Sequence, residues 1–322
     1  MPIPQSLAQL RLPLIGAPLF IVSNPELVIA QCRAGILGAF PALNAREPGE
    51  LAQWLEQIQQ ALAQPQPAGC PYPVAPFAVN QIVHPSNPRL AEDIELAARY
   101  RVPIMITSLH APTPVVQAAK TYGGLVFHDV ISLRHAEKAI EAGVDGLILV
   151  TAGAGGHAGP LNPFAFIEEV RKIYSGTIIL SGAMSRGHHI LAAQAMGADL
   201  AYMGTRFVAS AEARAVPEYK QMLVESGAED IVSSSSFTGV LGNYLRGSIV
   251  RAGLNPDELI QSDKSKVDFA SLRKNAGQKA WKDIWGAGQS VAGISAVMPA
   301  GQIVDQLEQE YRAARQRLGG AR

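Results

Sequence analysis

The sequence predicts an α/β protein built as a (β/α)8 TIM barrel with a smaller helical second domain. Eight short runs rich in Val, Ile and Leu alternate with helical patterns between residues 13 and 207. The runs are continuously apolar, which is typical of parallel strands buried on both faces. Eight such strand–helix units match a closed barrel. A doubly wound open sheet is the alternative, but it usually has fewer strands, and no G-x-G-x-x-G motif follows the first strand here.

The predicted strands and helices follow one another in regular order. The eight strands are expected at residues 13–20, 36–40, 75–80, 103–109, 125–130, 146–152, 177–183 and 200–207. One helix is expected between Asn24 and Gly35, another between Ser132 and Gly143, and a third begins at the cap residue Asn87. Capping residues or Pro at the start and Gly after the end are typical helix boundaries.

The strand signal fades after Phe207, and helical patterns replace it. Three later segments have such patterns: 242–253, 266–285 and 302–318. The serine run 233–236 indicates a loop between them. We therefore predict two domains. Residues 1–212 form the barrel and bind the cofactor, and residues 213–322 form a mostly helical substrate or cap domain, whose last helix can pack back on the barrel.

Composition and charge exclude several classes of partner. The 27 basic and 27 acidic residues cancel, and no basic stripe suggests nucleic acid. No apolar run reaches the roughly 18 residues of a membrane span, and the N-terminus has no signal-peptide pattern. Cys32 and Cys70 are too few for a disulfide framework or a thiolate metal site. The adjacent His188 and His189 diverge on a helix, so no metal is expected. We predict a cytoplasmic monomer or homodimer acting on a small molecule.

Polar residues and glycines gather where the predicted strands end, and in a TIM barrel these ends carry the active site. Asn80 ends the third strand, and His128 and Asp129 lie at the end of the fifth. Asn80 either contacts a cofactor or is a turn residue that bonds its own backbone. His128 either contacts the cofactor or pairs with Asp129. The loop TAGAGGHAGP, residues 151–160, follows the sixth strand.

The last two strand ends predict a phosphate site. Backbone N–H groups and helix N-termini bind anions at this place in many barrels. The candidate residues are Gly182, Ser185, Arg186, Gly187, Gly204, Thr205 and Arg206. The alternative is that these glycines only begin helices and that Arg206 faces solvent. A barrel with a phosphate site and an open glycine loop has room for a flat phosphorylated cofactor, and FMN fits that description.

His157 is the strongest catalytic candidate. It stands among glycines in the loop after the sixth strand. A neutral imidazole titrates near pH 6.5 and can take a proton at physiological pH. His157 can therefore act as a general base toward a substrate C–H. The alternative is a loop histidine that only bonds the backbone.

Taken together, these residues resemble the nitronate monooxygenase family, formerly called 2-nitropropane dioxygenases. The motifs that carry the resemblance are PLIGAP (13–18), GAGGHAG (153–159), SGAMSRGHHILAAQAMGADLAYMGTRFVAS (181–210), PEYK (217–220) and WGAGQSVAG (285–293). The resemblance implies a TIM barrel with non-covalent FMN. It also implies oxidation of alkyl nitronates, and of nitroalkanes, by O₂ to a carbonyl compound and nitrite, with His157 as the catalytic histidine.

The resemblance also implies which residues hold FMN. The phosphate would lie at Gly182, Ala183, Gly204 and Thr205. The remaining cofactor contacts would be Ala17, Pro18, Leu19, Asn80, His128, Gly155, Gly156, Ser181 and Gln289.

The chain departs from better-known members of this family, so we expect a divergent class. Ala17–Leu19 stands where a Gly-Gly-Met ending is common, and Asp129 stands where a lysine often follows the histidine. An unpaired carboxylate there would disfavour an anionic reduced flavin. Two other functions stay open. One is an NAD(P)H-dependent FMN reductase acting on quinones or an enoyl thioester, and the other is a flavin-free phosphosugar lyase or isomerase.

Overall fold

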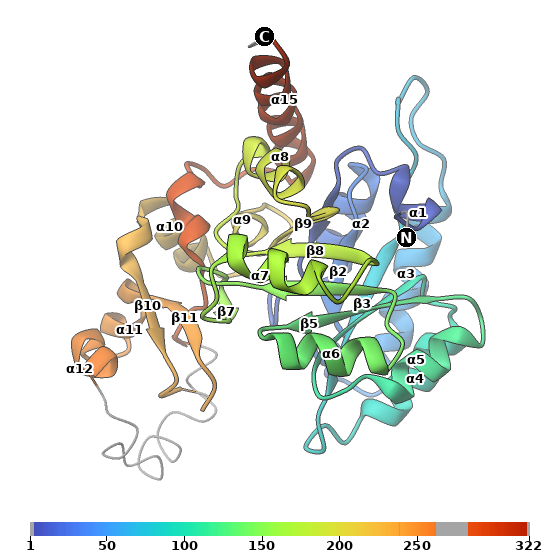
Figure 1. The fold of residues 1–322 in the computed structure, drawn as a ribbon, viewed down its shortest axis with the longest axis horizontal. Coiled ribbons are helices and arrows are strands. Elements are labelled where there is room, and N and C mark those ends of the chain that lie inside the picture. Colours follow the sequence, from blue (N-terminus) through green and yellow to red (C-terminus); the bar gives the residue numbers. More distant parts are fainter. Residues whose placement is uncertain (1–2, 238, 262–282, 321–322) are drawn as a thin grey trace.

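Eight parallel strands close into a barrel in the computed structural model, which describes residues 3–237, 239–261 and 283–320 (Figure 1). The strands are β1 (Leu14–Gly16), β2 (Gly38–Pro41), β3 (Phe77–Val83), β4 (Ile104–Leu109), β5 (Leu125–Val130), β6 (Gly146–Val150), β8 (Thr177–Ser181) and β9 (Leu200–Met203). Their order is β1-β9-β8-β6-β5-β4-β3-β2. A parallel bridge between Ile15 and Leu37 joins the two edges. The predicted TIM barrel is confirmed.

Helices surround this barrel. They are α1 (Gln5–Ala8), α2 (Pro25–Arg33), α3 (Glu50–Ala63), α4 (Leu90–Arg99), α5 (Thr113–Lys120), α6 (Leu133–Glu141), α7 (Pro163–Arg171), α8 (Gly187–Ala195) and α9 (Thr205–Val208). The predicted caps Asn24 and Ser132 accept hydrogen bonds from Leu27 N and His135 N. The Asn87 side chain instead accepts a hydrogen bond from Arg89 N in a turn, and Arg89 is the N-cap, so α4 begins two residues later than expected.

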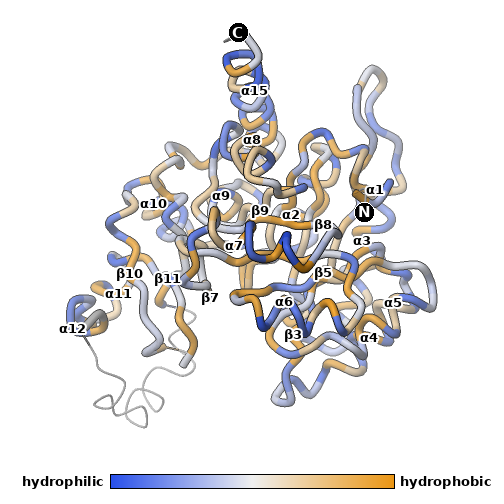
Figure 2. The backbone as a smooth tube through the Cα atoms, viewed as in Figure 1, coloured by the Kyte–Doolittle hydropathy of each residue, from blue (hydrophilic) through white to orange (hydrophobic). Residues whose placement is uncertain are grey.

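Strand alternation sorts the core into two layers. Side chains that point outward, such as Val79, Met105 and Leu147, pack under the helices. Ile148 and Ile179 belong to the second cluster, which fills the barrel interior. Figure 2 shows hydrophobic residues along the barrel strands and a mixture of hydrophilic and hydrophobic residues along the last helix. Because both faces of each strand are apolar, the runs in the sequence are continuous.

The region after the barrel contributes two strands to a small antiparallel sheet, and the loop after β6 contributes the third. It consists of β10 (Ile231–Ser234), β11 (Gly242–Leu245) and β7 (Gly156–His157), and it lies to the left of the barrel in Figure 1. The helix predicted from residue 242 and the loop predicted at 233–236 are therefore wrong in part. Pairing of β10 with β11 buries Val232 and Tyr244, and this long-range contact overrides the local pattern.

Short helices and one long helix complete the chain. They are α10 (Pro217–Glu225), α11 (Arg246–Arg251), α12 (Pro256–Gln261) and α15 (Ala300–Gly319), with 3-10 turns at Ala42–Asn44, Ala228–Asp230 and Gln289–Gly293. Most of the helix predicted at 266–285 lies outside the described residues. The domain boundary after residue 212 stays a prediction.

The last helix, α15, packs on α8 and α2 of the barrel. Glu310 accepts hydrogen bonds from Gly187 N at 2.7 Å and from the Arg186 guanidinium at 2.9 Å. Near the barrel's first strand, Arg11 bonds Glu308 at 2.6 Å. None of the helices in the described ranges has the length and apolarity that crossing a membrane requires. The cytoplasmic location and the monomeric or homodimeric state stay predictions.

Candidate active site

Four segments that are distant in sequence meet at the carboxyl ends of the strands. Gly288 N donates to the Thr205 hydroxyl at 3.0 Å, and this joins the segment before the Gln289 turn to the end of β9. Gly153 O, in the loop after β6, accepts from Gln289 N at 3.0 Å and from Ala183 N at 3.3 Å. The structure thus brings together four segments that the sequence predicted to share a site.

The loop after β1 reaches the same place. Ala17 N donates to Met203 O at 2.9 Å. A Cβ on Gly204 would lie 3.2 Å from Leu19 and 3.6 Å from Ala17. The predicted contacts Ala17–Leu19 therefore stand beside the predicted phosphate loop.

Asn44 holds this first loop in place. Its side chain accepts from Ile21 N at 2.8 Å and donates to Leu19 O and Ser23 O at 2.9 and 2.8 Å. These bonds support Ile21 at a φ of 69°, an unusual value for a β-branched residue. Sequence reasoning missed Asn44, because its role depends on a contact with a different strand loop.

Two glycines of the loop after β6, Gly155 and Gly156, have different structural roles. A Cβ on Gly155 would lie 2.8 Å from Gly288 N and 2.9 Å from the Thr205 hydroxyl, so Gly155 permits two backbones to pack closely. Gly156 has a φ of 66°, and a Cβ there would meet nothing within 4 Å. Gly156 is therefore the open glycine, next to His157.

Fewer residues are available for the predicted phosphate site than the sequence suggests. Glu310 occupies the N-terminus of α8, so Gly187 and Arg186 are engaged with the last helix. Gly187 is glycine because a Cβ would lie 1.9 Å from Leu307 O. Gly204 is the N-cap of the short helix α9. Phe207 N and Val208 N donate to Gly204 O, so the N–H groups of Thr205 and Arg206 are those without an acceptor within this helix. Gly182, with a φ of 141°, and the left-handed Ala183 lie in the loop after β8.

Arg206 and Ser185 are buried behind this loop. Arg206 is 3% exposed, so the alternative that it faces solvent is wrong. Burial lowers the pKa of Arg206 to about 10, and one of its Nη atoms contacts Met298 Sδ at 3.2 Å. Ser185 donates its backbone N–H to His189 Nδ1 at 3.1 Å. Neither side chain is presented at the surface of the loop.

His157 lies on the short strand β7. Its partner in the small sheet is Gly242 of β11, and Ala158 N donates to Leu241 O at 3.1 Å. The residue is exposed, yet the surrounding protein displaces enough water to lower the pKa of His157 below its ordinary value of 6.5. The imidazole is therefore neutral at pH 7, which is the form that a general base needs.

His128 points away from the barrel interior. It pairs in register with Leu147 of the outer layer, and its Nδ1 lies 2.8 Å from the Thr107 hydroxyl. It is 3% exposed, and burial lowers its pKa to about 4. The structure thus does not bring His128 to the predicted cofactor face, and its side chain points to the opposite face of β5 from that of Asp129.

Acid should destabilise the protein through His128. Its folded pKa of about 4 lies below the unfolded value of 6.5, so the neutral form stabilises the fold above pH 6.5 and this contribution is lost as the pH falls toward 4. We expect a loss of about 2 kcal/mol between pH 7 and pH 5. Urea unfolding at both pH values measures it. In His128→Asn, which keeps a group near the Thr107 hydroxyl but does not titrate, this part of the pH dependence should disappear.

Polar side chains line the top of the barrel interior. Asn80 lies within β3, which continues to Val83, and its amide donates to the Ser108 hydroxyl at 3.2 Å. The alternative that it bonds its own turn is therefore wrong. Asp129 on β5 and Tyr202 on β9 occupy the same interior layer. Ser108 and Tyr202 were missed, although both follow an apolar residue at the strand period of two.

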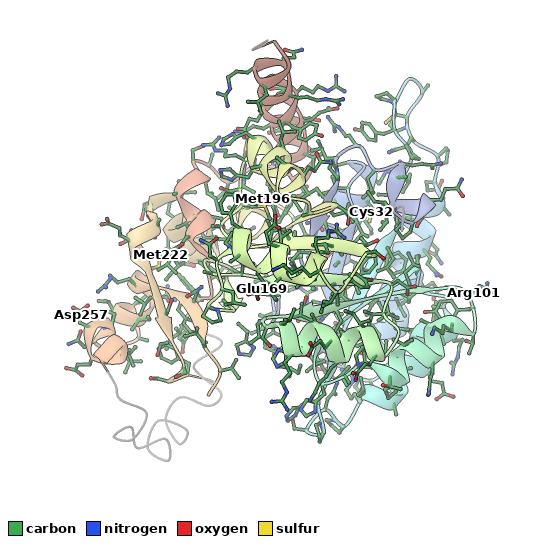
Figure 3. All side chains as sticks on the ribbon, viewed as in Figure 1. Cys32, Arg101, Glu169, Met196, Met222 and Asp257 are labelled. Atoms are coloured by element: carbon green, nitrogen blue, oxygen red, sulfur yellow. The ribbon has the colours of Figure 1, made fainter. Side chains whose placement is uncertain are left out.

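The cysteines take no part in this site. Cys32 is fully buried on α2 and lies on the barrel side of the molecule, whereas Met222 and Asp257 lie on the side of the small sheet (Figure 3). Burial raises the pKa of the Cys32 thiol to about 12. Among the described residues, no group of three or more His, Cys, Asp and Glu side chains could hold a metal ion.

Comparison with known proteins gives concordant matches. The family model described as nitronate monooxygenase matches residues 3–310. A nitronate monooxygenase of Paraburkholderia phytofirmans is 28% identical, covering 95% of this chain and 94% of that protein. A hydroxy-methyl-oxo-octahydroindene-carboxyl-CoA dehydrogenase of Mycobacterium tuberculosis is 24% identical, covering 83% of this chain and 70% of that protein.

Two solved structures have a similar fold. FabK from Thermotoga maritima is 25% identical with a TM-score of 0.77, and the match covers 98% of this chain and 97% of that one. A nitroalkane oxidase from Streptomyces ansochromogenes is 22% identical with a TM-score of 0.78, covering 97% of this chain and 99% of that one. At that identity the second match is a likeness of fold.

Proposed function

Since this chain belongs to the nitronate monooxygenase family and is thereby a flavin-type oxidoreductase, we propose that it oxidises alkyl nitronates, and nitroalkanes, with O₂ to a carbonyl compound and nitrite. FMN is the proposed cofactor. The observation that carries the proposal is the position of His157 on β7, at the rim where the loops after β6, β8 and β9 meet.

The residues at this rim fit a flat phosphorylated cofactor. The N–H groups of Thr205 and Arg206 lack an acceptor within α9, and a buried oxygen of Asp129 has no hydrogen-bond partner in the described part of the chain. Bound FMN would supply the redox chemistry, taking electrons from the nitronate and passing them to O₂. The proposed phosphate ligands are Gly182, Ala183, Gly204 and Thr205. The other proposed contacts are Ala17, Pro18, Leu19, Asn80, Gly155, Gly156, Ser181 and Gln289.

His157 supplies the proton chemistry in this proposal. With a nitroalkane, its neutral imidazole takes the proton from the carbon next to the nitro group. With a nitronate, which has already lost that proton, the imidazole orients the anion. The open Gly156 leaves room beside the ring for the substrate.

A second candidate is an NAD(P)H-dependent FMN reductase acting on a quinone or an enoyl thioester. The similarity to a relative named as a dehydrogenase of a CoA thioester favours it. The same barrel rim would then hold a different substrate over the cofactor.

One anaerobic titration separates the candidates. The protein is loaded with FMN, propyl-2-nitronate is added, and NADH follows, while the flavin absorbance is recorded. We expect bleaching by the nitronate, and release of nitrite when O₂ is admitted. No bleaching by the nitronate, followed by bleaching when NADH is added, would favour the reductase. A protein that takes up no FMN would contradict both functions.

A further inference from the structure

The side chains in the barrel interior change from apolar to polar along the barrel axis. Its lower and middle layers are apolar, with Ile106, Phe127 and Ile148 among them. The layer at the carboxyl ends is polar and comes from four strands: Asn80, Ser108, Asp129 and Tyr202. Barrel interiors are normally filled by branched apolar side chains. A polar layer at the site end is therefore suited to face a polar ligand.

Asp129 is the ionisable carboxyl in this layer. Phe127, two residues earlier, belongs to the interior cluster, and Asp129 pairs in register with the interior residue Ile148. Its Oδ1 is buried without a hydrogen-bond partner within the described ranges.

The groups that face Asp129 do not neutralise a charge on it. Ser108 from β4 supplies a hydroxyl, and Asn80 from β3 is already bonded to that hydroxyl. Tyr202 from β9 interacts electrostatically with Asp129, and its own pKa lies well above 10, so it is neutral. No cation in the described residues contributes to the pKa of Asp129. A buried carboxylate is costly, and this cost outweighs the hydrogen bond with the Ser108 hydroxyl, which favours the charged form, so the pKa of Asp129 is raised.

We propose that Asp129 recognises the flavin as a neutral carboxylic acid, donating its proton in a hydrogen bond to an acceptor atom of the isoalloxazine ring. This inference rests on the proposed FMN function. An ionised carboxylate has only acceptors, whereas the protonated group has one donor, and the ring's carbonyl and imine edge presents acceptors. Burial raises the pKa of Asp129 to about 7, so the acid form is available at physiological pH.

The test is the pH dependence of FMN affinity. The dissociation constant of FMN is measured by fluorescence quenching at pH 7 and pH 9, a range in which the phosphate of FMN is already a dianion. For the wild-type protein we expect binding to weaken by about fivefold or more at pH 9, because the proton that FMN binding requires is lost.

Two variants isolate the carboxyl. Asp129→Asn keeps a donor that cannot ionise, so its affinity at pH 7 should stay near that of the wild type and should not change at pH 9. Asp93→Asn is the matched control. Asp93 is also a buried carboxyl whose pKa burial raises, but it lies on α4 and pairs with Arg89, outside the barrel. It should keep the wild-type pH dependence.

The measurements separate a failure of the role inferred for Asp129 from a failure of the proposed FMN-dependent function. If wild-type affinity is the same at pH 7 and pH 9, or if Asp129→Asn weakens in parallel with the wild type, Asp129 does not act as an acid toward FMN. The wild-type measurement decides this even if the variant does not fold. Nitronate oxidation could then still stand, whereas a protein without FMN affinity at either pH would overturn both.

Discussion

Replacing His157 with asparagine is expected to lower kcat/KM for a nitroalkane by about 10²- to 10⁴-fold, the usual contribution of a general base. Asparagine can donate and accept hydrogen bonds but cannot take the proton from carbon. The loss should be much smaller with the corresponding nitronate, which arrives deprotonated. Nitrite release from nitroethane and from ethyl nitronate, measured side by side, gives both values.

The pH profile provides a second measurement on the same variant. The pKa of His157 is lowered below 6.5, so nitroalkane turnover by the wild type should fall only below that pH, and this acidic limb should be absent in His157→Asn. His135→Asn, on the outer helix α6, is the control and should behave as the wild type. Unchanged nitroalkane turnover in His157→Asn would rule out its role as base.

Replacing Gly187 with alanine is expected to lower the free energy of unfolding by about 3 kcal/mol, at the upper end of overpacking effects. The added Cβ would lie 1.9 Å from Leu307 O and 2.4 Å from Tyr311 N. Both are backbone atoms of α15, so no side chain can rotate away and the helix itself must shift. The hydrogen bond from Gly187 N to Glu310 would be strained at the same time. Urea unfolding measures the loss.

Gly301→Ala is the matched control, because it makes the same change within α15 itself. A Cβ on Gly301 would meet nothing within 4 Å, and alanine favours a helix over glycine. This variant should be as stable as the wild type or slightly more stable. Limited proteolysis should release the C-terminal helix faster from Gly187→Ala only. Equal stability of the two variants would show that α15 does not depend on this close approach.

Local patterns were sufficient to predict the barrel. Each strand is a short apolar run, and Asn24 and Ser132 cap helices by bonds within four residues. The small sheet was missed because Val232 and Tyr244 become strand residues only through pairing with each other. Such pairing leaves little trace in a single sequence.

Site residues were harder to predict for a different reason. On strands buried on both faces, hydrophobicity does not show which face is the barrel interior. Because successive side chains point to opposite faces, an error of one residue places the wrong side chain in the site. The sequence therefore predicts a cofactor contact for His128, although the side chain of its neighbour Asp129 is the one that points into the barrel interior. Gly187 matched a phosphate loop by type, but its role is set by a helix more than a hundred residues later in the chain.

The strand that carries His157 has a consequence for how enzymes of this shape can diversify. The backbone of Gly156 and His157 pairs with Asn243 and Gly242, so the proposed base and the small sheet are parts of one ladder. Removing β10 and β11 would therefore remove the strand partner that supports His157. Side-chain changes on β10 and β11 would leave this ladder intact, whereas a change in the main-chain path of β11 would displace His157.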